Sequence, residues 1–194
     1  VFVETEQGYT QKVSYELISK GKALAEEKKC RMTAVVIGSD IDAVIGEAAA
    51  YGADQIIAVD APVYEYYSTD GYAVTMTELI RKYRPETVLI GATDNGRDLA
   101  PRIACALQTG LTADCTGIGI DAKTGCIAWT RPTFGGNLMA TIICPTERPQ
   151  MGTVRPGVFA TGLYEEEKKR KILEKEEEKK KIGNSRIGGE SPIL

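Results

Sequence analysis

Two stretches of the sequence combine residue types and spacings that could bind a ligand. The first, VLIGATDNGRDLAPRIACALQTG from Val88 to Gly110, passes from an apolar run through two glycines into a helical pattern. Many phosphate-binding loops have this order, because backbone N–H groups at a helix start can hold phosphate oxygens. The stretch has neither GxGxxG nor GxxxxGK followed by Ser or Thr, and Asp94 and Asp98 add negative charge. These residues therefore disfavour a phosphate site.

Arg97 is the candidate anion ligand of this stretch. We expect Gly91 to Arg97 to form a polar loop, followed by a helix over residues 99–107 with Asp98 as its N-cap and Pro101 at N3. Loops at the carboxyl ends of strands are where open α/β sheets place ligands, so Arg97 could bind an anion there. A surface position or a salt bridge to a neighbouring aspartate is the favoured interpretation.

The second stretch is TRPTFGGN, residues 130–137. Arg131 precedes a proline, which favours an extended backbone and projects the guanidinium group. Phe134, Gly135 and Gly136 offer an aromatic face beside an unobstructed backbone, which could lie over a flat, electron-rich ring system. The alternative is a hairpin whose glycines only supply positive φ angles, and physical reasoning alone favours that alternative.

Composition excludes several functional classes. The chain has 194 residues, 24 basic and 27 acidic side chains and no histidine, so histidine-based acid–base chemistry is absent from it. It has no basic cluster with interleaved aromatics, no long apolar run and no signal-peptide pattern, so we expect neither nucleic-acid binding nor membrane insertion. The odd number of scattered cysteines argues against disulfides and zinc. Cys105 and Cys115 are expected to be buried thiols.

The elements that must position these stretches follow from hydrophobic periodicity. Residues 1–109 alternate strand-like runs with amphipathic helical patterns, which predicts a three-layer, doubly wound, mainly parallel sheet of the adenine-nucleotide-hydrolase-like type. The expected strands are 1–4, 33–38, 55–59 and 87–91, and the expected helices include Val13 to Ala25, Ile41 to Tyr51 and Met76 to Tyr83.

From Thr112 to Phe159 short strand-like pieces with turn signals predict a β-rich, antiparallel C-terminal extension. Within it, three prolines in CPTERPQMGTVRPGVF suit an edge or an extended arm of the kind that another subunit holds. We expect residues 160–194 to form a charged helical or flexible tail, because every residue between Glu165 and Lys181 except Ile172 and Leu173 is charged.

Two ordered segments, GATDNGRDLAPRIACALQTGLTADCTG and TRPTFGGNLMATIICPTERPQMGTVRPG, carry a family resemblance. Residues 1–159 resemble the N-terminal domain of the alpha subunit of electron transfer flavoprotein, a family that includes FixB-type proteins. The resemblance implies a heterodimer with a beta subunit, carrying electrons from acyl-CoA dehydrogenases or similar flavoenzymes. It implies an electron carrier, not an enzyme, in the bacterial cytoplasm in preference to the mitochondrial matrix.

The resemblance also implies where cofactors bind. In this family the alpha FAD lies mainly in a second domain, which we do not expect after Phe159, and the beta subunit holds AMP or, in NADH-dependent electron-bifurcating members, a second FAD. Arg131 is then expected to approach the beta-subunit flavin, and Phe134, Gly135 and Gly136 are expected to shape that approach. A free-standing adenine-nucleotide-binding sensor and a nucleotide-directed enzyme remain as alternatives.

Overall fold

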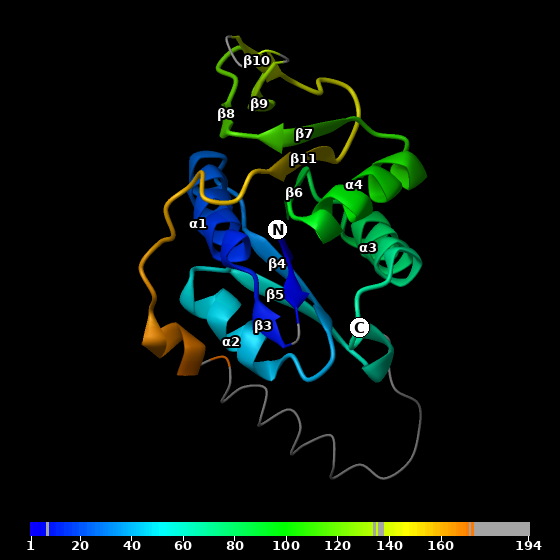
Figure 1. Ribbon diagram of the computed structural model, residues 1–194. Helices are drawn as coiled ribbons and strands as arrows, with labels where there is room; N and C mark the ends of the chain where they lie inside the picture. Colours follow the sequence, from blue (N-terminus) through cyan, green and yellow to red (C-terminus); the bar gives the residue numbers. More distant parts are fainter. Residues whose placement is uncertain (7, 134, 136–137, 171, 173–194) are drawn as a thin grey trace.

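The computed structural model describes residues 1–6, 8–133, 135, 138–170 and 172 (Figure 1). Two parallel three-stranded sheets form its centre, in the orders β1-β4-β5 and β6-β11-β7, and β1 also contacts β6, so the two sheets adjoin. Their strands are β1 (Phe2–Val3), β4 (Thr33–Gly38), β5 (Gln55–Asp60), β6 (Thr87–Gly91), β7 (Leu111–Cys115) and β11 (Gln150–Val154).

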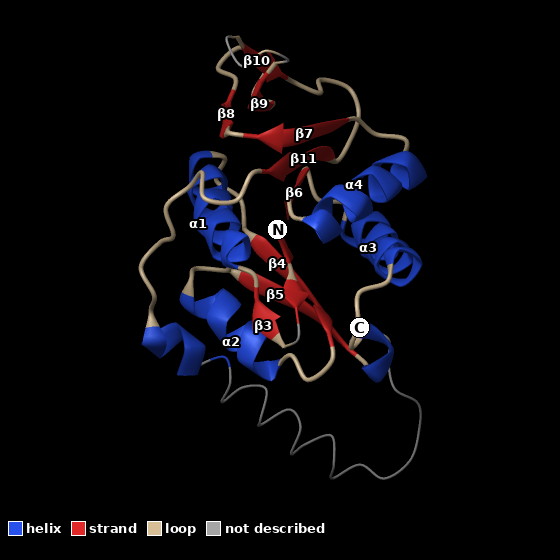
Figure 2. Cartoon of the chain, in the orientation of Figure 1, coloured by secondary structure: helices blue, strands red, loops and turns tan. Residues whose placement is uncertain are grey.

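Helices cover both faces of these sheets, as Figure 2 shows with α1 and α2 on one side and α3 and α4 on the other. Buried side chains of α3 and α4 share one hydrophobic cluster with β6, whereas those of α1 and α2 belong to two other clusters, one of which contains side chains of both helices. This confirms the expected three-layer α/β architecture. The helices are α1 (Lys12–Glu27), α2 (Asp42–Ala50), α3 (Thr69–Tyr83) and α4 (Asp94–Leu107), with a 3-10 turn η1 (Pro62–Tyr64).

The start of α4 differs from the prediction. Thr93 is the N-cap, because its side chain accepts a hydrogen bond of 3.0 Å from the Gly96 N–H, so the helix begins at Asp94 and the expected loop to Arg97 is mostly helical. Pro101 consequently lies inside the helix. The helix tolerates the missing backbone hydrogen bond because its inner face is fully buried, at Leu99, Ala100, Ile103 and Ala104.

The proline-flanked segment near the end of the extension also differs from the prediction. Gln150–Val154 is neither an edge nor an arm: it is the middle strand β11, paired with β6 on one side and β7 on the other, and all five residues are buried. Pro149 and Pro156 flank the strand without entering it, so its N–H groups remain available for both ladders. The local proline count was therefore misleading.

The antiparallel part of the extension is smaller than expected. It comprises β8 (Gly117–Ile120), β9 (Ile127–Pro132) and β10 (Met139–Ile142), in the order β10-β9-β8. This sheet lies at one end of the molecule, next to β7 and β11 (Figure 1). A short hairpin of β2 (Thr5–Glu6) and β3 (Tyr9–Thr10) follows β1.

Residues 164–170 lie next to α2. The Glu165 N–H donates to Ala50 O at 3.0 Å, the rings of Tyr51 and Tyr164 lie 5.4 Å apart, and residues 166–170 are helical. Most of the charged segment up to Lys181 lies outside the described residues. None of the helices in the described part of the chain is long and apolar enough to cross a membrane.

Candidate functional site

The strand that carries Arg131 is held against the parallel sheet by a buried tryptophan. Trp129, 1% exposed, lies on the backbone of Gly152 in β11, where a Cβ atom would clash with its ring. Two residues earlier along β9, the Ile127 N–H donates to the buried side-chain oxygen of Gln150 at 2.8 Å. These contacts fix β9 over the middle strand of the sheet.

Strand alternation then determines where Arg131 lies. Because side chains two residues apart share a face, Arg131 is on the face of Ile127 and Trp129, which is turned towards the parallel sheet. Its charge acts on two residues at the carboxyl end of β7, Asp114 and Cys115. Among the residues that the structure describes, no side chain forms a hydrogen bond or an ion pair with the Arg131 guanidinium.

Two more arginines pair with Asp114 at this edge. It accepts from Arg155 through both oxygens, with Nε–Oδ1 at 3.2 Å and Nη2–Oδ2 at 2.6 Å, and Arg97 Nη2 lies 3.5 Å from Oδ1. The hydrogen bond from Arg155 lowers the pKa of Asp114, and the charges of Arg97 and Arg131 lower it further. We name Arg97, Arg131 and Arg155 around Asp114 the arginine cluster: Arg97 and Arg155 contact the carboxylate, and Arg131 acts on it through its charge.

The backbone of Asp114 explains its position. Its φ of 58° is in the left-handed region, at an irregularity in the pairing of β7 with β11, and its N–H donates to Thr153 Oγ1 at 2.9 Å. Aspartate tolerates this conformation better than most residues with a Cβ. Sequence reasoning missed Asp114, although an aspartate inside the strand-like segment TADC is a detectable departure from β propensity.

The prediction for Arg97 is confirmed in its favoured form, because the side chain pairs with an aspartate. Its Nε also donates to Ala92 O at 3.0 Å, so two sides of the guanidinium are already engaged. Asp98 is not the helix cap. Its carboxylate instead accepts from Tyr67 at 2.7 Å and from Thr69.

Only part of the predicted glycine tip can be compared. Phe134 and Gly136 lie outside the described residues. Gly135 is exposed with a φ of 92°, and the Thr133 N–H donates to Leu138 O at 2.9 Å across the turn. The positive φ accounts for glycine at this position, whatever else the turn contacts.

The carboxyl edge beside α4 already holds a negative charge. Glu4, which follows β1, is buried, and its carboxylate accepts from the Thr93 hydroxyl that caps α4. Burial raises the pKa of Glu4, although the hydrogen bond from Thr93 opposes the shift. A carboxylate therefore occupies the neighbourhood where a phosphate would meet the helix start, which disfavours nucleotide binding there.

The cysteine prediction is half right. Cys115 is buried, and burial raises the pKa of its thiol to about 11, so it is not a nucleophile. Cys105 is exposed, because it lies on the outer face of α4 next to the buried Ala104. The described residues contain no group of His, Cys, Asp and Glu that could hold a metal ion.

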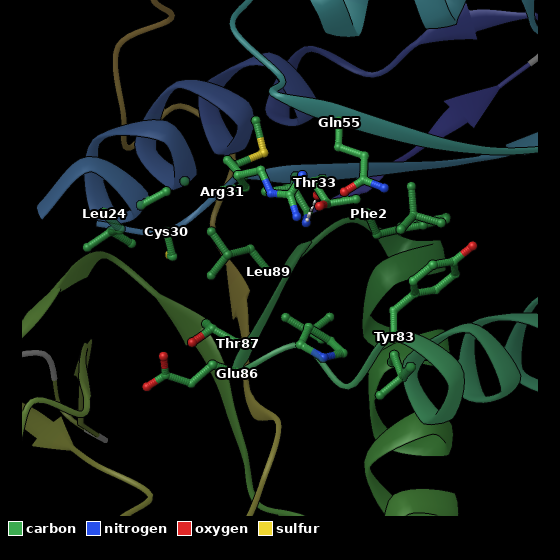
Figure 3. Close-up of a pocket in the computed structure, with 18 of the residues that line it drawn as sticks. Phe2, Leu24, Cys30, Arg31, Thr33, Gln55, Tyr83, Glu86, Thr87 and Leu89 are labelled. Carbon is green, nitrogen blue, oxygen red and sulfur yellow. Dashed lines mark hydrogen bonds between the residues drawn. The ribbon is translucent and has the colours of Figure 1, made fainter. Parts of the chain in front are cut away.

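One hollow lies at the opposite edge of the sheets from the arginine cluster. It has a volume of about 500 Å³ and opens at the amino ends of the strands, near Thr33, Gln55 and Thr87 (Figure 3). Lys28 and Glu86 line it and form an ion pair of 2.6 Å. Ligands of open α/β sheets bind at the opposite, carboxyl edge, so this hollow is not assigned a function.

Comparisons with known proteins agree with the residue pattern. Residues 1–181 match the family described as electron transfer flavoprotein domain. The "Electron transfer flavoprotein subunit alpha" of Thermoanaerobacterium thermosaccharolyticum is 46% identical over 172 residues, 89% of this chain and 52% of that protein. "Protein FixB" of Azorhizobium caulinodans is 44% identical over 175 residues, 89% of this chain and 47% of that protein.

A further relative carries a different name. The "Acryloyl-CoA reductase electron transfer subunit beta" of Anaerotignum propionicum is 40% identical over 189 residues, which cover 86% of this chain and 52% of that protein. The chain thus spans about half the length of the curated relatives it matches.

Proposed function

The chain belongs to the electron transfer flavoprotein domain family, and we propose that it acts in a heterodimeric electron transfer flavoprotein, as the scaffold on which a beta subunit and its flavin or AMP site rest. In this role the chain binds and orients, and the flavin supplies the redox chemistry. The proposal includes a bacterial cytoplasmic location, which the bacterial origin of the relatives supports. It also includes an acyl-CoA flavoenzyme as redox partner, which the name of the Anaerotignum relative supports.

The observation that carries this proposal is the position of Arg131. β9 is fixed over the sheet by Trp129, and the guanidinium stands at the sheet edge with its donors free of other described side chains. A guanidinium held in this way can hydrogen-bond the anionic form of a flavin and favour its reduction. Gly135, in the turn that follows β9, has no side chain and leaves room for the backbone to approach a ring.

The described residues fit a flavin that the partner subunit holds, not an FAD bound wholly by this domain. They include no glycine-rich phosphate loop, and Glu4 places a carboxylate at the start of α4. The same two observations weigh against a free-standing adenine-nucleotide-binding sensor. Electron bifurcation with NADH is a further part of the proposal, and its test requires the assembled heterodimer.

The test compares flavin potentials in heterodimers reconstituted with the beta subunit. Arg131→Ala removes a charge-assisted hydrogen bond worth about 1.5–3 kcal/mol, so the potential of the partner-held flavin should fall by roughly 60–130 mV for a one-electron couple. Arg131→Lys keeps the charge and should lose less. Arg81→Ala is the control, because Arg81 is an exposed arginine of α3 paired with Glu78.

Spectroelectrochemical titration measures the flavin potentials of these heterodimers. Equal potentials in wild type, Arg131→Ala and Arg81→Ala would remove Arg131 from the flavin site. A chain that forms no yellow heterodimer and binds AMP alone would favour the sensor instead.

A further inference from the structure

The carboxylate of Asp114 lies among arginines that come from three other parts of the chain. Arg155, which directly follows β11, and Arg97 on α4 contact it at 2.6 Å and 3.5 Å. Arg155 also donates its backbone N–H to Cys115 O at 3.0 Å, so its main chain and its side chain are both fixed at the end of β7. With Arg131, three positive charges and one negative charge share this edge, and Asp114 is the group that cancels part of the arginine charge.

A backbone hydrogen bond places Asp114 close to Arg131. The Thr116 N–H donates to Thr130 O at 2.8 Å, which joins the chain just after β7 to the residue just before Arg131. Neighbouring strands are about 4.8 Å apart, so one strand spacing and two residues separate Asp114 from Arg131. The pKa of Asp114 is lowered first by the hydrogen bond from Arg155 and also by the charge of Arg131, which agrees with this short separation.

The backbone at Asp114 accepts one uncharged residue of nearly the same shape. Its φ is 58°, and its N–H is held by Thr153 Oγ1 at 2.9 Å. Asparagine and aspartate adopt this left-handed conformation more readily than most other residues with a Cβ. Asp114→Asn therefore changes the charge at this position while the backbone keeps its conformation.

The arginine partners of Asp114 are open to solvent. The side chains of Arg155 and Arg97 are 46% and 58% exposed. Exposed ion pairs contribute little to folding stability, whereas a charge also acts on groups that it does not touch. The effect of Asp114 should therefore appear at a bound group more than in the stability of the fold.

We propose that Asp114 is a positioning residue of the flavin site: it holds Arg97 and Arg155 beside Arg131, and its charge lowers the potential of the flavin that Arg131 meets. The inference rests on the proposed function, since it takes that flavin to be held by the partner subunit. Nearby positive charge stabilises the reduced, anionic flavin and a nearby carboxylate destabilises it. Arg131 and Asp114 thus act on the same potential in opposite directions.

The test measures flavin potentials of heterodimers formed by the full chain and the beta subunit. Asp114→Asn keeps an acceptor oxygen for Arg155 and removes the negative charge. At an effective dielectric constant of about 20, a unit charge about 12 Å away changes an equilibrium about tenfold. One-electron reduction of the partner-held flavin should become more favourable by about that factor, which raises its potential by about 59 mV.

Arg155→Gln separates charge from contact. It removes the positive member of the same ion pair, so it should lower the potential by at least about threefold in the reduction equilibrium, opposite in sign to Asp114→Asn. Loss of the ion pair as a structural contact would move both variants in one direction. Both shifts should shrink in 1 M salt, where the Debye length is about 3 Å.

Asp54→Asn is the matched control. Asp54 also pairs with a cation at 2.6 Å, and its side chain is 28% exposed against 29% for Asp114. It directly precedes β5, and β5 and β7 are the outermost strands of the two adjoining sheets, five strand spacings or roughly 24 Å apart. Asp54→Asn should change the reduction equilibrium by less than about twofold. Unchanged far-UV circular dichroism shows that each variant is folded before its potential is measured.

The outcomes separate this inference from the proposed function. A wild-type potential in Asp114→Asn, with Arg131→Ala still lowering it, would overturn the role of Asp114 and leave the proposed function standing. Shifts of one sign in Asp114→Asn and Arg155→Gln, or an equal shift in Asp54→Asn, would also overturn that role. A wild-type potential in Arg131→Ala would instead overturn the flavin site on which both proposals rest.

Discussion

Gly152 is the position where one added methyl group should disturb both the fold and the site. An ideal Cβ there would lie 2.7 Å from Trp129 Cη2 and closer still to Cζ3 and Cε3, whereas ordinary contacts are 3.4–4 Å. Trp129 is rigid and buried between two sheets, and Gly152 is in the middle strand of three, so neither can move away freely. Gly152→Ala therefore forces the antiparallel sheet away from β11.

The expected cost follows from two opposing effects. Overpacking a core costs about 1–3 kcal/mol, and the contact with a rigid ring places Gly152→Ala near the upper end. Replacing glycine with alanine recovers about 0.4–1 kcal/mol by restricting the unfolded chain. The net loss of about 2 kcal/mol in unfolding free energy corresponds to a fall in Tm of roughly 4–8 °C for a chain of this size.

The assay is thermal and urea unfolding, followed by the emission of Trp129. Gly152→Ala should lower Tm and alter native-state emission, because the indole ring of Trp129 no longer packs against β11. Gly119→Ala is the control: Gly119 lies in β8 of the same antiparallel sheet, no heavy atom lies within 4 Å of its ideal Cβ, and its backbone is not left-handed. That variant should be as stable as wild type or slightly more stable.

A double-mutant cycle identifies the cause. In a Trp129→Leu background the smaller side chain removes the clash, so the cost of Gly152→Ala should largely disappear. Because this background has no tryptophan, unfolding of all four proteins in the cycle is followed by far-UV circular dichroism. If Gly152→Ala has wild-type Tm and emission, or costs the same in both backgrounds, the account of how β9 docks is refuted.

Two other properties can be measured on the same protein. The pKa of Glu4 is raised above its usual 4.5, so the folded state binds this proton more tightly than the unfolded state does. The contribution of Glu4 to the unfolding free energy therefore falls as pH rises from 4.5 to the raised pKa. Glu4→Gln should therefore gain Tm relative to wild type as pH rises above 4.5, and a difference that does not change with pH would contradict this. Thiol reagents should modify the exposed Cys30 and Cys105 quickly but the buried Cys115 and Cys126 only on unfolding; rapid labelling of all four in native protein would refute that burial.

Local patterns predicted the first half of the fold well. Strands at 33–38 and 87–91 have the predicted bounds, because parallel strands covered on both faces form continuous apolar runs with sharp ends. The start of α4 was misplaced because Asp98 and Pro101 together suggested a cap that Thr93 provides instead. β11 was misjudged because prolines next to a strand resemble prolines inside one.

The candidate site was predictable only in part. Arg131 stood out because its proline and glycine neighbours are unusual, and the salt bridge of Arg97 followed from the nearby aspartates. The partner of that salt bridge did not follow, since Asp114 comes from a different strand. Glu4 gave no local signal at all, because a single glutamate after a strand is ordinary until its burial is known.

The layered α/β class, the lack of histidine in the given chain and the family resemblance can be read without the structure, because they depend on composition, period and ordered motifs. Tertiary structure decided that β11 lies between β6 and β7, which brings Arg97, Arg155 and Asp114 to one edge. It also decided that Trp129 lies on Gly152 and so directs Arg131 towards that edge. These arrangements join residues far apart in the chain, and no local propensity encodes which distant strands pair.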